Sequence, residues 1–349
     1  MSKKILLIIG ILALSSFTLL VLLSNTLNEK NGFDRIYSFN DIVLQKEFNL
    51  NNLPIKVKDI CNSNNKPLYV STFDPRFYFK FDQNLKLIDT LKVGLETKLA
   101  QYINSGFDAS IMDSLLIIYA KNSGLIIRYK VGSKHYNVIQ SPSQLITKSL
   151  TMDTSYSTLR IFNKDNTQSF IKISNIDGKE QNRSNIINSD PKGGFSTDGM
   201  LVYNTRDSII FYIQYYTNKF YCLDKNFNLL YENHTIDTIF HNPIENSKFH
   251  TRKSGQFMPE VPLKNINKDA SSYNNRLVIN SSLIADNEPR NLLQKNYIFD
   301  IYNTSTGKYI SSIKIPKFGT NNMLDFKVND NKFILLCDNK LLIINVTIP

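Results

Sequence analysis

The sequence of 349 residues contains no tryptophan, only three cysteines and only four histidines. Without tryptophan it lacks the best aromatic platform for stacking on a sugar. Cys61, Cys222 and Cys337 lie far apart, and an odd count leaves at least one thiol unpaired even in a compartment that permits disulfides. Cys222 and Cys337 each stand in an apolar run before an aspartate, so we expect buried, unreactive thiols.

Two common site motifs are also missing. No Gly-x-Ser-x-Gly motif of a serine hydrolase occurs in the chain. The most glycine-rich stretch, Gly193–Gly199, leads into a strand-like run and has no Lys-Ser/Thr pair, unlike a phosphate-binding loop. It is interpreted as a loop and tight turn, with Gly199 supplying positive φ after Asp198.

The charge is moderately basic, with 41 Lys and Arg against 30 Asp and Glu and a formal net charge of +11. The basic residues are scattered, whereas a nucleic-acid-binding protein concentrates them on one face of a known module. We therefore expect no nucleic-acid partner. A weak attraction to anionic lipid or to polyanionic cell-surface sugar is compatible with this charge.

The N-terminus has the pattern of a membrane segment. Lys3 and Lys4 precede an almost unbroken apolar run, Ile5–Leu23, which is near the roughly 20 residues that cross a bilayer as a helix. No small-x-small cleavage site and no lipid-accepting cysteine follow it directly. We predict a cytoplasmic tail over residues 1–4, an uncleaved transmembrane signal anchor over 5–24 and a linker over 25–39. By the positive-inside tendency the rest of the chain lies in a bacterial periplasm. A cleaved signal and a secreted protein are the alternative.

Beyond this segment the sequence predicts an all-β protein. Apolar runs of four to eight residues alternate with short polar turns, and one strand-turn-strand unit recurs at intervals of about 40–50 residues. Compare residues 77–88, 125–133, 170–178, 220–230 and 297–310. Such periods are typical of the four-stranded blades of a β-propeller. One longer interval holds a polar stretch, about 237–272, which is interpreted as an insert within a blade.

The last blade lacks one strand, because the chain ends after its third. The segment Asp41–Phe48 has a strand pattern and is predicted to supply the fourth, closing the ring and removing an exposed sheet edge. The propeller domain is thus predicted over residues 40–349, with six blades. A seventh blade in the long interval and a pair of β-sandwiches are the alternatives.

Several segments resemble uncharacterised, membrane-anchored or exported six-bladed propeller-like proteins of Bacteroidetes. The similar stretches span about residues 190–315 and comprise residues 193–204, 209–229, 235–238, 276–289 and 297–302. The resemblance implies a propeller in a bacterial cell envelope and an association with membrane redox proteins. It implies no established activity.

Three of the four histidines lie close together in a short stretch that includes the start of the insert: His234, His241 and His250. Their spacing fits no zinc motif, and the neighbouring Arg252 and Lys253 would repel a cation. We therefore expect no metal site. These five residues are predicted to belong to a polar contact surface on one face of the propeller.

Aspartates recur near the starts of strands and in turns, among them Asp113, Asp153 and Asp198. Aspartate in a turn commonly bonds its own backbone, and this is the favoured interpretation. Carboxylates that converge on the central channel could instead act as acid and base, as in a hydrolase or lyase. No cofactor is indicated.

The sequence thus favours a membrane-tethered periplasmic propeller that binds an envelope protein or a small ligand. One alternative is a propeller hydrolase or lyase. Another is a sensor, although the short cytoplasmic tail leaves almost no room for a domain that passes on a signal. Fold alone does not decide among them.

Overall fold

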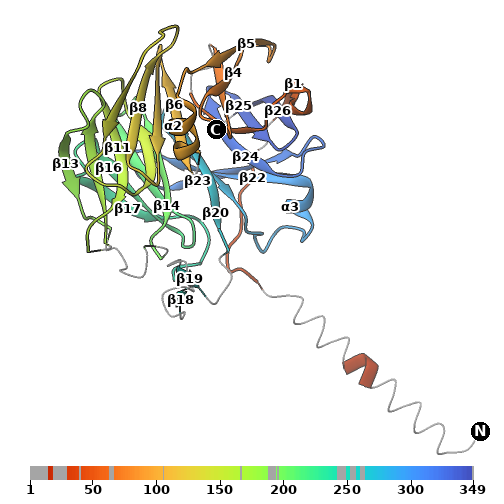
Figure 1. Cartoon of the computed structure of the whole chain (residues 1–349). Helices are drawn as coiled ribbons and strands as arrows, with labels where there is room; N and C mark the ends of the chain where they lie inside the picture. Colours follow the sequence, from red (N-terminus) through yellow and green to blue (C-terminus); the bar gives the residue numbers. More distant parts are fainter. Residues whose placement is uncertain are drawn as a thin grey trace, which may run out of the picture.

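The computed structural model describes residues 15–18, 30–38, 41–62, 67–104, 106–165, 167–187, 194, 196–241, 249–251, 257–259 and 264–347. Within these residues the chain forms six four-stranded antiparallel sheets and one small hairpin. The sheets are the blades of a six-bladed β-propeller (Figure 1). This confirms the predicted fold and blade number over the seven-bladed and sandwich alternatives.

The blades are numbered one to six along the chain. Blades one to three consist of β2 (Val57–Ile60), β3 (Leu68–Thr72), β4 (Phe77–Phe81) and β5 (Leu87–Lys92); β6 (Phe107–Met112), β7 (Leu115–Ala120), β8 (Leu125–Lys130) and β9 (Tyr136–Gln140); and β10 (Ile146–Thr151), β11 (Tyr156–Phe162), β12 (Gln168–Ser174) and β13 (Glu180–Ser184). Blades four to six consist of β14 (Gly199–Asn204), β15 (Ile209–Gln214), β16 (Lys219–Asp224) and β17 (Leu229–His234); β20 (Asn267–Tyr273), β21 (Arg276–Ser281), β22 (Asn296–Asn303) and β23 (Tyr309–Pro316); and β24 (Met323–Asn329), β25 (Lys332–Cys337), β26 (Lys340–Val346) and β1 (Ile42–Asn49).

The first strand of each blade lines the central axis. β24 contacts both β20 and β2, β14 contacts β20 and β10, and β10 contacts β6. A backbone bond of 2.8 Å from Ile111 to the carbonyl of Cys61 joins β6 to the end of β2. We call the end at which these inner strands begin the start face. The opposite end, which carries the hairpin turns after each inner strand, is the turn face.

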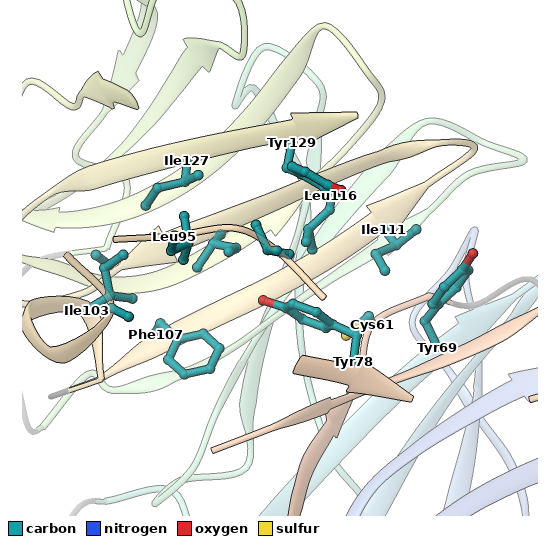
Figure 2. Close-up of a cluster of buried hydrophobic side chains, with 14 residues drawn as sticks. Cys61, Tyr69, Tyr78, Leu95, Ile103, Phe107, Ile111, Leu116, Ile127 and Tyr129 are labelled. Carbon is teal, nitrogen blue, oxygen red and sulfur yellow. The ribbon is translucent and has the colours of Figure 1, made fainter. Parts of the chain in front are cut away.

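Apolar packing between blades explains the sequence pattern. Middle strands such as β15 are buried along their whole length, whereas outer strands such as β17 alternate between exposed and half-buried residues. Figure 2 shows the packing between blades one and two, in a buried apolar cluster that includes Cys61, Tyr78, Phe107 and Ile127. A strand covered on both faces needs apolar residues at every position, whereas an outer strand with one face to solvent alternates.

The ring is closed by the two ends of the chain, as predicted. β1 pairs antiparallel with β26, from Ile42 opposite Val346 to Asn49 opposite Lys340 (Figure 1). A short helix, η1 (Leu50–Asn52), then leads into blade one. The closure covers the edge of β26, which would otherwise offer unpaired backbone groups to another chain.

The structure corrects both the end of the predicted insert and its position relative to the blades. Asn267–Tyr273 forms β20, the inner strand of blade five, so the insert does not reach residue 272. The segment also connects blades four and five and does not interrupt a blade. Its described part includes the hairpin of β18 (Phe249–Thr251) and β19 (Phe257–Pro259).

Glycine is required at position 199 for a different reason from the one predicted. Its φ is not positive; it opens β14, and a Cβ there would lie 2.2 Å from the carbonyl oxygen of Ile213. The close approach of two strands, and not a turn, therefore requires glycine.

The predicted linker is also corrected, because residues 31–38 pack against blade five. Arg35 is 3% exposed and bonds both carboxylate oxygens of Asp300, at 2.7 and 3.1 Å. It reaches the carboxylate of Glu288 at 2.9 Å. We call residues 31–38 the strap. Burial opposes the charge of Arg35, but Asp300 and Glu288 outweigh it and raise the guanidinium pKa.

Two helices lie in connections on the start face, α2 (Thr97–Ile103) and α3 (Leu292–Lys295). Among the described residues no helix has the length and apolarity to cross a bilayer. The predicted anchor over residues 5–24 lies outside the described residues, apart from the helical turn at 15–18.

Candidate functional site

A cavity of about 320 Å³ occupies the central channel towards the turn face. Its wall is built from the second halves of the inner strands and the residues that follow them. Polar groups come from all six blades and include the side chains of Asn62, Ser110, Thr151, Thr205, Ser272 and Lys327. This size and the convergence of several elements are usual for a small-ligand site.

A charged cluster lies beside the inner end of the cavity, between blades five, six and one. Lys327 Nζ is 2.7 Å from Asp325 Oδ1. Asp269 and Asp59 lie close enough to affect the charge of Lys327. Burial opposes the ammonium charge, but the surrounding carboxylates raise the pKa of Lys327, so it stays protonated.

The carboxylates of this cluster also connect neighbouring blades. Asp269 Oδ2 accepts the N–H of Phe326 at 3.1 Å, and Asp325 Oδ2 accepts the N–H of Ile60 at 2.7 Å. Phe326 follows Asp325 in sequence, just as Ile60 follows Asp59. An aspartate of one blade therefore accepts a backbone N–H of the next blade twice, once between blades five and six and once between blades six and one.

Burial changes the acidity of two of these groups. Loss of bulk water raises the pKa of Asp269 well above its usual range; Asp325 adds to this effect and Lys327 opposes it. Burial likewise raises the pKa of Asp59, with Lys58 opposing. Their protons are thus held more tightly than those of exposed aspartates.

The opposite side of the channel is richer in cations. Asp108 pairs with Lys121 at 2.8 Å and accepts a bond from Ser149 at 3.0 Å. Asp198 pairs with Arg160 at 3.2 Å and with Lys148 at 3.5 Å. Each carboxylate is thus already neutralised by a partner within the protein.

The three predicted channel carboxylates do not converge. Asp113 stands in the β6–β7 turn with φ of 54° and lies only at the mouth of the cavity. Asp153 is exposed and accepts the backbone N–H groups of Ser155 and Tyr156, both at 2.7 Å. Of the three, only Asp198 lies among the charged residues near the channel, where it is held in ion pairs. The favoured turn interpretation fits Asp113 and Asp153.

The predicted histidine surface is described only in part. His234 is exposed at the end of β17, with its ring 5.5 Å from that of Phe240, and His241 is exposed nearby in sequence. The side chain of His250 and all of Arg252 and Lys253 lie outside the described residues. No group of three His, Cys, Asp or Glu side chains that could hold a metal occurs in the described part of the chain. The contact surface stays a prediction.

The cluster of Asp59, Asp269 and Asp325 was not predicted from the sequence, although part of it leaves a signal there. Asp108, Asp269 and Asp325 each stand four residues before the last residue of an inner strand. Asp-Ala-Ser occurs at both 108–110 and 269–271. An alignment of the inner strands on their turns would have placed these aspartates at one level.

The cysteines behave as predicted. Cys61, Cys222 and Cys337 are free and buried. Burial raises the pKa of Cys61 to about 12 and that of Cys222 to about 11. Since the thiolate is the reactive form, these thiols are inert at neutral pH. Cys61 lines the cavity but is only 4% exposed.

Fold and channel define the class of this protein as a six-bladed β-propeller with a polar, internally ion-paired channel. No protein-family model matches the chain, and no curated protein matches it in sequence.

Solved structures resemble the chain in fold. The virginiamycin B lyase of Staphylococcus aureus has a TM-score of 0.52 at 11% identity, over 88% of this chain and 100% of the lyase. A catalytically inactive variant of that lyase with quinupristin gives 0.51 at 11%, over 87% and 99%. The WD40 domain of Neurospora crassa Pan2 gives 0.50 at 11%, over 89% and 97%. At this identity the likeness shows the fold alone.

Proposed function

We propose that this protein is a non-catalytic binding module of the bacterial cell envelope that takes a small polar ligand in its channel cavity. Its N-terminal apolar run, residues 5–24, would tether it to the inner membrane, with the propeller in the periplasm. The observation that carries the binding role is the cavity of about 320 Å³, in which polar groups from all six blades converge.

The ligand class follows from the charges around the cavity. Lys327 at its inner end is paired with Asp325, so a charged ligand group would have to displace an existing ion pair. An uncharged group such as the hydroxyl of Ser110 bonds a neutral polar partner without that cost. We therefore propose a neutral ligand rich in hydroxyl or amide groups, such as a short saccharide or peptide.

A hydrolase or lyase gains no support from the arrangement of side chains. A general acid or base must be a titratable group within hydrogen-bond reach of the substrate atom that it protonates or deprotonates. Asp153 is engaged in its turn, Asp198 is ion-paired, and none of the described residues that line the cavity is a histidine. The lyase activity named for the similar Staphylococcus structures does not transfer at 11% identity.

The binding role is tested by thermal unfolding of the full-length protein with a panel of mono- and disaccharides and short peptides. A ligand at 100 times its Kd stabilises the folded state by about 2.7 kcal/mol, so its melting temperature should rise by several degrees. Ser110→Phe, which fills the cavity, should abolish the rise. Ser114→Phe, in the exposed turn four residues on, is the matched control and should keep it.

The binding role is wrong if no compound shifts the transition or if the shift survives Ser110→Phe. A change in the covalent structure of a bound compound, followed by mass spectrometry, would favour the enzyme alternative instead.

A further inference from the structure

The point at which the N-terminal chain leaves the propeller is held firmly on the start face. The backbone N–H groups of Asn31 and Gly32 donate to the carboxylate of Asp286 at 2.6 and 3.1 Å. The hydroxyl of Thr238 donates to the carbonyl of Asn31 at 2.5 Å. Phe33 is buried in a small apolar cluster with Ile266, Leu283 and Ala285. The exit point therefore has a definite place beside the loop after β17 and the loop after β21.

The exit point is close in sequence to the apolar run. Six residues, 24–29, separate Leu23 from Lys30. Even fully extended, six residues span only about 20 Å. If the run crosses the bilayer, the exit point must lie within that distance of the lipid surface.

The surface around the exit point has the composition of a membrane interface. Phe240 is 54% exposed and follows Thr238, the partner of Asn31, by two residues. Exposed basic residues accompany it directly before the strap and in the same two connections, together with His241. We call the following residues the exit patch: Lys30, Phe240, His241, Lys264, Arg290 and Lys295.

Acidic groups nearby offset only part of this charge, because the exposed carboxylates of Asp34 and Asp286 stand against four basic residues of the exit patch. Asp286 is engaged by the backbone N–H groups of the strap. Glu288 is held by Arg35 at 2.9 Å. Aromatic side chains prefer the headgroup level of a bilayer, and lysine or arginine near its surface is attracted by anionic lipid.

We propose that the exit patch lies against anionic lipid headgroups, with Phe240 at the bilayer interface. This inference rests on the proposed membrane tether and adds an orientation to it. The start face then points to the membrane. The cavity, whose mouth includes Asp113 and Thr205 on the turn face, opens away from it towards soluble ligands.

The absence of tryptophan allows a direct test, because one introduced tryptophan is the sole indole fluorophore. Full-length Phe240→Trp is reconstituted into vesicles of phosphatidylglycerol and phosphatidylcholine that contain bromine-labelled lipid, a quencher at bilayer depth. Ile176→Trp, 66% exposed in a turn on the opposite face, is the matched control. His241→Trp provides a second position in the exit patch.

We expect at least twofold quenching of Trp fluorescence in Phe240→Trp and His241→Trp and little in Ile176→Trp. Lys264→Glu combined with Arg290→Glu should reduce the quenching in phosphatidylglycerol vesicles. Equal quenching at both faces overturns the proposed orientation.

A carbonate wash separates failure of the orientation from failure of the tether. Protein that stays in washed membranes but shows no quenching in the exit patch keeps the tether and loses the orientation. Protein that is released by the wash contradicts the tether and, with it, the orientation.

Discussion

Asp269 is a half-buried carboxylic acid on the inner strand of blade five, next to a second carboxylate. Partial burial raises its pKa well above the usual range. It nevertheless accepts the N–H of Phe326 in the next blade. The residue thus combines a structural bond with an ionisable group that the fold prefers to keep protonated.

This arrangement predicts a pH dependence of stability. The pKa of Asp269 is raised in the folded state. Its contribution to the free energy of unfolding is therefore fully present below about 3.9, its pKa in the unfolded chain, and is lost as the pH rises through its folded-state pKa. Asp269→Asn keeps an oxygen for Phe326 but cannot ionise. Its free energy of unfolding should fall less than that of the wild type between pH 4.5 and 7.5.

Urea unfolding at several pH values checks this prediction. Asp153→Asn, in an exposed turn, is the matched control and should follow the wild-type slope. A slope in Asp269→Asn as steep as in the wild type would show that the carboxyl of Asp269 does not control the pH dependence.

At the scale of elements, the strap is held mainly by one buried side chain. Besides Asp300 and Glu288, Arg35 donates to the hydroxyl of Ser281 at 2.8 Å and to the carbonyl of Leu283 at 3.0 Å. Tyr37 donates to Glu288 as well, and burial together with this bond raises its phenol pKa. An extended segment without a sheet of its own is thereby fixed to blade five.

Loss of this side chain should be costly, because two buried carboxylates would remain without their cation. Arg35→Ala is expected to lower the free energy of unfolding by about 3–5 kcal/mol. Arg183, which pairs with Glu180 on the surface at 2.6 Å, is the matched control. Arg183→Ala should cost no more than about 1 kcal/mol.

Guanidinium unfolding of the two variants measures the difference. Equal losses would mean that the Arg35 network contributes no more than an exposed ion pair.

At the scale of the whole molecule, closure by β1 joins residues from opposite ends of the chain. Phe48 packs edge-on against Phe81 of blade one at 5.0 Å, so β1 also connects blade six to blade one. A propeller without β1 has an open sheet edge and a gap between two blades.

Truncation tests the importance of closure. A chain without residues 1–29 keeps the strap and β1, and it should remain folded and run as a discrete species in size-exclusion chromatography. A chain without residues 1–49 loses both and should aggregate or unfold. A folded, monodisperse product from the longer deletion would show that blade six is stable without β1.

Local pattern was enough for much of the architecture. The alternation in Asp41–Phe48 predicted the closing strand, and the repeated strand-turn-strand units predicted six blades. The turn role of Asp153 and the burial of the cysteines also followed from neighbouring residues. Each of these features depends on the period-two geometry of a strand or on the bonds of a short turn, which a few consecutive residues specify.

The sites that matter for function required the folded chain. Arg35 and Asp300 are 265 residues apart, as are Ile60 and Asp325. Each aspartate has the same local sequence signal whether it bonds its own turn, as Asp153 does, or the next blade, as Asp325 does. Which of the two occurs depends on how blades pack around the axis. Composition and strand pattern therefore determined the propeller, whereas the cavity, its ion pairs and the docked strap were decided by long-range packing, because only packing brings distant polar groups into one desolvated space.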